Sequence, residues 1–174
     1  MYAQDEELYD VLTWASERLL ETQDEFGRIS TYTTENEFCG WDMWCRKYVL
    51  TGLQHYLRIC KNEKLKEKIL MACCRHLDYI IDKIGDGKIE ISTTSKWWGA
   101  VNSSTILEPT VELYKMTQHE RYLDFAKYII PYIRDFAESQ EGKTYIAKWK
   151  RNHPEYEDDE FTGYDYDDED DEEL

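Results

Sequence analysis

A chain of 174 residues, 41% of them apolar and 14% aromatic, is long enough to fold as one domain with a hydrophobic core. The net charge of −16 and the absence of a basic stripe argue against nucleic-acid binding, and no stretch is apolar for long enough to span a bilayer. The acidic start, residues 1–7, does not resemble a signal peptide, and the five cysteines have no compact disulfide spacing. For the chain as it stands, both features predict a cytoplasmic, reducing location, and export by means of a removed signal peptide is the alternative.

Apolar residues recur at helical spacing from the start of the chain. A first helix is predicted over residues 6–22. The second, over residues 42–60, is apolar around most of its circumference, which is typical of an inner helix. Asn62 is suited to cap a third helix, over residues 65–84, which carries a single apolar stripe.

Two further helices are predicted in the second half of the chain. One begins near Thr105 and runs to Met116, because Pro109 is tolerated only in a first turn. The other follows Gln118, and Pro131 is expected to kink or restart it.

The second and third helices resemble the last two. A shift of 58 residues superposes Leu53 on Val111 and Tyr56 on Tyr114. Each pair comprises a more apolar helix, a tight turn and a more amphipathic helix, and such hairpins stack side by side. The predicted fold class is therefore all-α, with stacked helix hairpins.

The acidic residues are concentrated at the end of the chain. Residues 155–174 contain 13 acidic and no basic side chains, whereas the rest of the chain has 24 acidic and 21 basic ones. Such a run repels itself and cannot bury enough surface to fold. We predict a helical domain over residues 1–150 and a disordered acidic tail over residues 151–174. The alternatives for the tail are a docking segment for a basic partner and a loose cation site.

Two loop segments rich in tryptophan, residues 37–44 and 95–104, precede the more apolar helix of each hairpin. Indole rings can cover the C–H face of a sugar while carboxylates, amides and hydroxyls bind its hydroxyl groups. Because hairpin stacking gathers the connecting loops on one face, both segments are expected at the same rim. The side chains predicted to bind the sugar are Glu37, Trp41, Trp44, Trp97, Trp98, Asn102 and Ser103. The alternatives are core packing for the tryptophans and helix capping for Asn102 and Ser103.

Several motifs resemble one family of sugar-cleaving enzymes. They are Trp41-Asp-x-Trp-x-x-Lys-Tyr48, Gly52-Leu53, Ile106-Leu-Glu108, Leu113-Tyr-x-x-Thr117 and Glu120-Arg-Tyr-Leu-Asp124. Together they resemble the catalytic toroid of glycoside hydrolase family 127, best known for β-L-arabinofuranosidases, over residues 37–133. Epimerases and unsaturated uronyl hydrolases of related fold share the hairpin pattern more loosely. The resemblance implies an (α/α)6 barrel with a sugar site at its rim.

Two carboxylates are the candidates for catalysis, because glycoside hydrolysis needs two carboxyl groups flanking the bond. The resemblance implies that Glu108, at the start of an inner helix, points into the site. Asp42 is the second candidate, with a helix cap or dipole partner as its alternative role. Where the family has a histidine that contacts the sugar, this chain has Ser104-Thr105, which leaves the sugar open.

The resemblance also implies a zinc-bound cysteine nucleophile, with Glu-x-Cys and Cys-Cys motifs in a later part of the barrel. Here Cys73-Cys74 lies in an amphipathic helix without a Glu-x-Cys companion, which favours packing. Cys39 and Cys45 flank the first loop but lack the spacing of a zinc site. We predict neither a metal nor a cofactor.

The length of the chain limits the functional interpretation. A closed barrel of about twelve helices needs about twice this length. We therefore expect a truncated or split family member whose exposed inner surface binds a second copy or a complementing toroid half. The leading hypothesis is a carbohydrate-active domain that contributes the rim of a sugar-binding cleft; whether the chain is itself an enzyme stays open. The alternatives are a non-catalytic helical module that binds carbohydrate or protein, and another toroid sugar enzyme such as an epimerase. The epimerase ranks last because His55, His76 and His119 occupy polar helix or cap positions away from the rim.

Overall fold

The computed structural model describes residues 5–95 and 99–152. The residue contacts divide the chain into two compact units, Met1–Phe136 and Ala137–Leu174. The first unit contains α1 (Glu6–Glu21), α2 (Asp42–Leu57), α3 (Glu63–Lys83), the short 3-10 helix η1 (Ile91–Thr93), α4 (Gly99–Ser104), α5 (Leu107–Thr117) and most of α6 (Glu120–Glu138). The second unit contains α7 (Gln140–Asn152). The described residues include no strand beyond an isolated bridge between Ile84 and Ile89, which confirms the all-α prediction.

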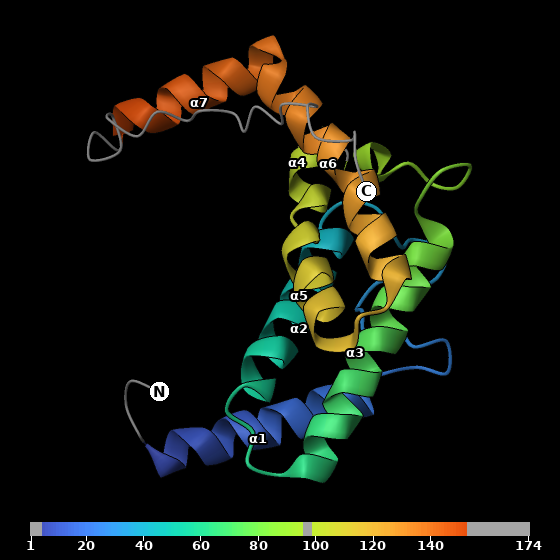
Figure 1. The fold of residues 1–174 in the computed structure, drawn as a ribbon, viewed down its shortest axis with the longest axis vertical. Helices are drawn as coiled ribbons and strands as arrows, with labels where there is room; N and C mark the ends of the chain where they lie inside the picture. The colour runs from blue at the N-terminus through green and yellow to red at the C-terminus, as the bar shows by residue number, and fades with distance from the viewer. Residues whose placement is uncertain (1–4, 96–98, 153–174) are drawn as a thin grey trace, which may run out of the picture. The chain divides into compact units, whose positions relative to one another are not determined.

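In the first unit α2 and α3 run antiparallel to each other, and α1 crosses near their ends (Figure 1). α2 lies beside α3 and also contacts α1, α4 and α5, so it is the central helix of the unit, as its apolar sequence predicted. A salt bridge joins α6 to α3, with Arg121 Nη1 3.1 Å from Asp78 Oδ1. The two predicted hairpins are thus α2–α3 and α5–α6.

The core lies between these helices. Its fully buried members include Leu50, Leu53, Ile69, Leu77, Ile80, Leu113, Tyr122 and Ile129. On α2, α3 and α6 these residues are about one or two helical turns apart and so share one face, which is why the hydrophobic periodicity located these helices correctly.

The structure differs from the sequence-based prediction at several boundaries. α2 ends at Leu57 rather than Cys60, and α6 continues through Pro131 as one helix. Pro131 is exposed, so water can hydrate the carbonyl that loses its N–H partner. The predicted domain boundary at residue 150 stays a prediction. The acidic tail lies outside the described residues from residue 153 onward.

No helix within the described ranges is both long enough and apolar enough to cross a membrane.

Asn62 caps α3, as the sequence predicted. Its side-chain oxygen accepts a hydrogen bond from the backbone N–H of Leu65 at 3.2 Å. We expect Asn62→Ala to lower the free energy of unfolding by about 1 kcal/mol, because one N–H of the first turn loses its partner. Asn62→Ser keeps a hydrogen-bond acceptor, so its free energy of unfolding should fall much less. Urea unfolding followed by far-UV circular dichroism measures both; equal losses for the two variants would contradict the capping role.

Candidate functional site

The loop between α1 and α2, residues 22–41, folds over the start of α2 and is fastened to α3. At Gly27 the backbone has a φ of +94° and approaches α3 closely, so an added Cβ would lie 2.8 Å from the carbonyl oxygen of Arg75. Only glycine fits this crossing. The amide of Gln23 adds hydrogen bonds to the carbonyl oxygens of Gly27 and Ala72. The loop is therefore held to the body of the unit.

A buried arginine of α2 connects the loop to the helix. Arg46 is fully buried, and its Nε lies 3.0 Å from Asp42 Oδ2 while its Nη2 lies 3.0 Å from Glu37 Oε2. One guanidinium thus binds two carboxylates, one from the loop and one from its own helix. Paired in this way, buried charges avoid the cost of an uncompensated ion.

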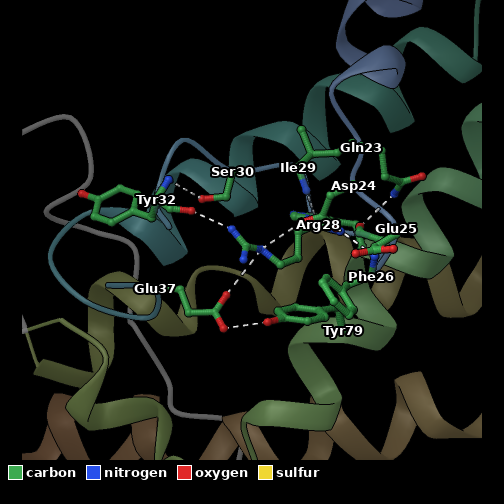
Figure 2. Close-up of polar contacts among 12 residues, drawn as sticks. Gln23, Asp24, Glu25, Phe26, Arg28, Ile29, Ser30, Tyr32, Glu37 and Tyr79 are labelled. Carbon is green, nitrogen blue, oxygen red and sulfur yellow. Dashed lines mark hydrogen bonds and ion pairs between the residues drawn. The ribbon is translucent and has the colours of Figure 1, made fainter. Parts of the chain in front are cut away.

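Glu37 has three partners, one each from the loop, α2 and α3, and two of them, Arg28 and Tyr79, are labelled in Figure 2. In addition to Arg46, its Oε1 accepts a hydrogen bond from the Tyr79 hydroxyl at 2.6 Å, and its Oε2 lies 3.6 Å from Arg28 Nε. Burial, followed by the bond to Glu37, raises the pKa of Tyr79. The residues Arg28, Glu37, Asp42, Arg46 and Tyr79 are called the Arg46 cluster below. The charges of its two arginines and two carboxylates balance.

Asp42, predicted as a catalytic candidate, is the first residue of α2 and is fully buried. Its Oδ1 accepts from the Ser30 hydroxyl at 2.7 Å, and its Oδ2 accepts from the backbone N–H of Phe38 at 2.8 Å. Together with the bond from Arg46, these contacts engage both oxygens of the carboxylate inside the protein. Asp42 and Glu37 therefore meet at Arg46, inside the structure.

An exposed group of aromatic rings adjoins this cluster. Trp41 is 50% exposed, and its ring meets that of Trp44 edge-on with the ring centres 6.2 Å apart. The Trp44 ring also meets the Tyr48 ring edge-on, with the ring centres 5.3 Å apart. Tyr48 was not predicted as a site residue, although its position four residues after Trp44 places both on one helix face. Trp41, Trp44 and Tyr48 are called the aromatic surface below.

Glu108, the other catalytic candidate, lies at the start of α5 beside this surface. Its side chain is 62% exposed, and its Oε2 lies 3.5 Å from Lys47 Nζ. The Lys47 ammonium also lies 4.4 Å from the centre of the Tyr48 ring, within cation–π range. A buried hydrogen bond from Gln54 to the carbonyl of Pro109 ties α5 to α2 here. The structure thus brings Glu108 to the aromatic surface through Lys47.

The second tryptophan segment is described only in part. Trp97 and Trp98 lie outside the described residues, and the predicted loop forms the short helix α4 from Gly99 onward. Both polar candidates are buried: the Thr94 hydroxyl lies 2.6 Å from Ser103 Oγ, and Asn102 Nδ2 donates to Ser95 Oγ at 3.4 Å. Their predicted contact with a sugar stays a prediction.

His76 was assigned to a polar helix position, and here the sequence interpretation was wrong. The ring is fully buried, and its Nδ1 accepts a hydrogen bond from the backbone N–H of Ile29 at 3.0 Å. Burial, followed by repulsion from Arg46 and Arg28, lowers the pKa of His76 to about 3. A neutral histidine therefore supports the loop from α3.

Exposed aromatic rings beside an accessible carboxylate can bind a polar ligand that has apolar faces. Comparison with protein families gives a match over residues 1–162 to "Beta-L-arabinofuranosidase, GH127 catalytic domain". The chain belongs to this family of glycoside hydrolase domains, which confirms the resemblance seen in the motifs. The catalytic domain of the family is an α/α toroid, and the helix hairpins form part of it. No curated protein and no solved structure matches the chain.

The cysteines of the chain do not fit the zinc centre that the family implies. Burial, followed by the charge of Cys74, raises the pKa of the Cys73 thiol to about 12, and burial also raises the pKa of Cys74. Zinc binds the thiolate, which such an environment disfavours. Among residues 5–95 and 99–152, no group of three or more His, Cys, Asp or Glu side chains could hold a metal ion. We assign no step to a metal.

Proposed function

We propose that the aromatic surface and Glu108 form part of the rim of a sugar-binding cleft in a glycoside hydrolase domain. The observation that carries the proposal is the position of an exposed carboxylate beside three rings, with Lys47 between them. The family match supports a carbohydrate as the ligand class.

The chemistry of these groups suits a polyol with apolar faces. Trp41 and Tyr48 are about half exposed, so their rings are accessible to the C–H face of a sugar. The Glu108 carboxylate can accept hydrogen bonds from sugar hydroxyls, and the Lys47 ammonium can donate to them. Ion pairing with Lys47 restricts the Glu108 side chain, which reduces the ordering cost of binding.

The two predicted catalytic carboxylates differ in accessibility. Glu108 is exposed, whereas Asp42 is fully buried and bound to three protein groups. We therefore propose that Glu108 contacts the sugar directly and that Asp42 and Glu37 support the loop that carries Trp41. A catalytic role for Asp42, and assembly with a second copy or a complementing toroid half, stay predictions.

Substitution of Trp41 tests the proposal. In titrations of the chain with a panel of neutral glycosides that includes a β-L-arabinofuranoside, we expect Trp41→Ala to weaken binding about tenfold or more, as for a central aromatic contact. Trp14 provides the matched control, because it is 63% exposed on α1, and Trp14→Ala should bind like the wild type. Equal affinities for wild type and Trp41→Ala would contradict the proposal.

Glu108→Gln tests the carboxylate separately. The variant keeps the size of the side chain and loses its charge, so we expect weaker sugar binding than in the wild type. Any hydrolysis of nitrophenyl glycosides by the chain should be lost as well. Turnover that persisted in Glu108→Gln would overturn the assignment of Glu108 to the site.

A further inference from the structure

We propose that Arg46 is a positioning residue for the aromatic surface. By binding Glu37 and Asp42 at once, it holds residues 37–41 in the conformation that presents Trp41. The role in sugar binding rests on the function proposed above, whereas the effect on the loop can be tested without a sugar.

The loop adopts an unfavourable backbone conformation immediately before Trp41. Phe38 has a φ of +56°, in the left-handed region that bulky side chains rarely occupy, and Gly40 follows with a φ of +54°. Phe38 is also buried. Strain of this kind persists only where the surrounding structure imposes it, and it is concentrated at functional sites.

Arg46 contacts the chain on both sides of the strained residue, in the loop and at the start of α2, and it also contacts that residue itself. Before Phe38, its Nη2 binds Glu37; after Phe38, its Nε binds Asp42. Asp42 also accepts the backbone N–H of Phe38. The guanidinium carbon lies 4.6 Å from the centre of the Phe38 ring and 5.7 Å from the centre of the Tyr79 ring. These two rings are nearly parallel, with their centres 6.2 Å apart.

The position of Trp41 follows from this arrangement. Its backbone N–H donates to the Tyr32 hydroxyl at 3.2 Å, and its carbonyl accepts the N–H of Cys45 at 2.9 Å in the first turn of α2. The turn at Phe38 and Gly40 thus leads directly into the first residue of α2. If the turn relaxed, Trp41 would lose its fixed place beside Trp44.

The two bonds need an arginine. The guanidinium presents separate N–H donors in a rigid fork, so it can bind two carboxylates in fixed directions. A lysine retains the positive charge, but its single ammonium group cannot reproduce both directional bonds. Arg46→Lys therefore releases the loop while keeping a cation among Glu37 and Asp42.

Hydrogen exchange measured by mass spectrometry, together with sugar titration, tests the proposal. In Arg46→Lys we expect faster amide exchange in peptides covering residues 37–42 and unchanged exchange in the middle of α3. If only about a tenth of the molecules keep the competent loop, the apparent dissociation constant for the sugar rises about tenfold. Arg58→Lys is the matched control, because Arg58 is half exposed and binds Glu112 on the surface; neither quantity should change.

The outcomes distinguish this proposal from the proposed function. A wild-type chain that binds no sugar would remove the proposed function, while the exchange rates would still test whether Arg46 holds the loop. Unchanged loop exchange in Arg46→Lys, or faster exchange with unchanged sugar affinity, would overturn the positioning role. If exchange rose throughout the unit, Tyr79→Phe would decide, because it removes one hydrogen bond to Glu37 and leaves Arg46 in place. Faster exchange confined to residues 37–42 in that variant supports the proposal, and wild-type exchange overturns it.

Discussion

Asp42→Ala is expected to lower the free energy of unfolding by about 3–5 kcal/mol, the range measured when one partner of a buried ion pair is removed. The carboxylate is fully buried and binds Arg46, the Ser30 hydroxyl and the backbone N–H of Phe38. Its removal leaves the buried guanidinium with only Glu37 as an ion-pair partner from the loop. Equilibrium unfolding in urea, followed by far-UV circular dichroism, measures the loss.

Asp82 provides the comparison for this prediction. It also forms an ion pair, with Arg121 at 2.9 Å, but its side chain is 67% exposed. Asp82→Ala should therefore lower the free energy of unfolding by less than about 1 kcal/mol. The loss of unfolding free energy in Asp42→Asn should lie between those of the two alanine variants, because the asparagine retains an acceptor for the N–H of Phe38. Similar losses for Asp42→Ala and Asp82→Ala would show that the Arg46 cluster does not hold the loop.

The second large effect is the loss of folding stability at acid pH that His76 causes. The pKa of His76 is about 3 in the folded chain, below its ordinary value of 6.5, because the ring is desolvated and faces Arg46 and Arg28. The unfolded chain therefore binds the proton first, so this histidine lowers the stability of the fold as pH falls from about 6.5 towards 3. From about pH 7.5 to about pH 5, the free energy of unfolding should decrease by about 2 kcal/mol.

A variant that cannot titrate separates this effect from the carboxylates. His76→Asn offers an oxygen to the N–H of Ile29 and carries no charge at any pH. We expect it to be less stable than the wild type at neutral pH, because the smaller side chain leaves a cavity. Its free energy of unfolding should change much less between about pH 7 and about pH 5. A slope as steep as that of the wild type would contradict the assignment to His76.

The helices were predictable because their signals are local. Apolar residues at helical spacing located α1, α2, α3, α5 and α6, and the cap at Asn62 fixed the start of α3. α4 was missed because a six-residue helix is too short to show a period. α7 was missed because its sequence is largely polar, with few apolar residues at helical spacing.

The site was predictable only in part. Trp41, Trp44 and Glu108 were predicted from their residue types and the family motif, and their contact with a sugar stays a prediction. The structure brings Glu108 to the aromatic surface through Lys47. Arg46 was missed because arginines are rarely fully buried and a single sequence does not reveal that two carboxylates enclose one. The burial of His76 was missed because a single sequence does not reveal which distant segment covers a side chain. Its burial depends on a loop more than forty residues away in the chain.

The most direct test of the sugar-binding rim is the NMR spectrum of the indole N–H groups of the wild-type chain during titration with a glycoside that binds. We expect concentration-dependent shifts for Trp41 and Trp44, with no shift for Trp14 on α1. In Glu108→Gln the same two signals should move only at higher sugar concentrations. Signals of Trp41 and Trp44 that stay unchanged while the sugar binds would contradict the account.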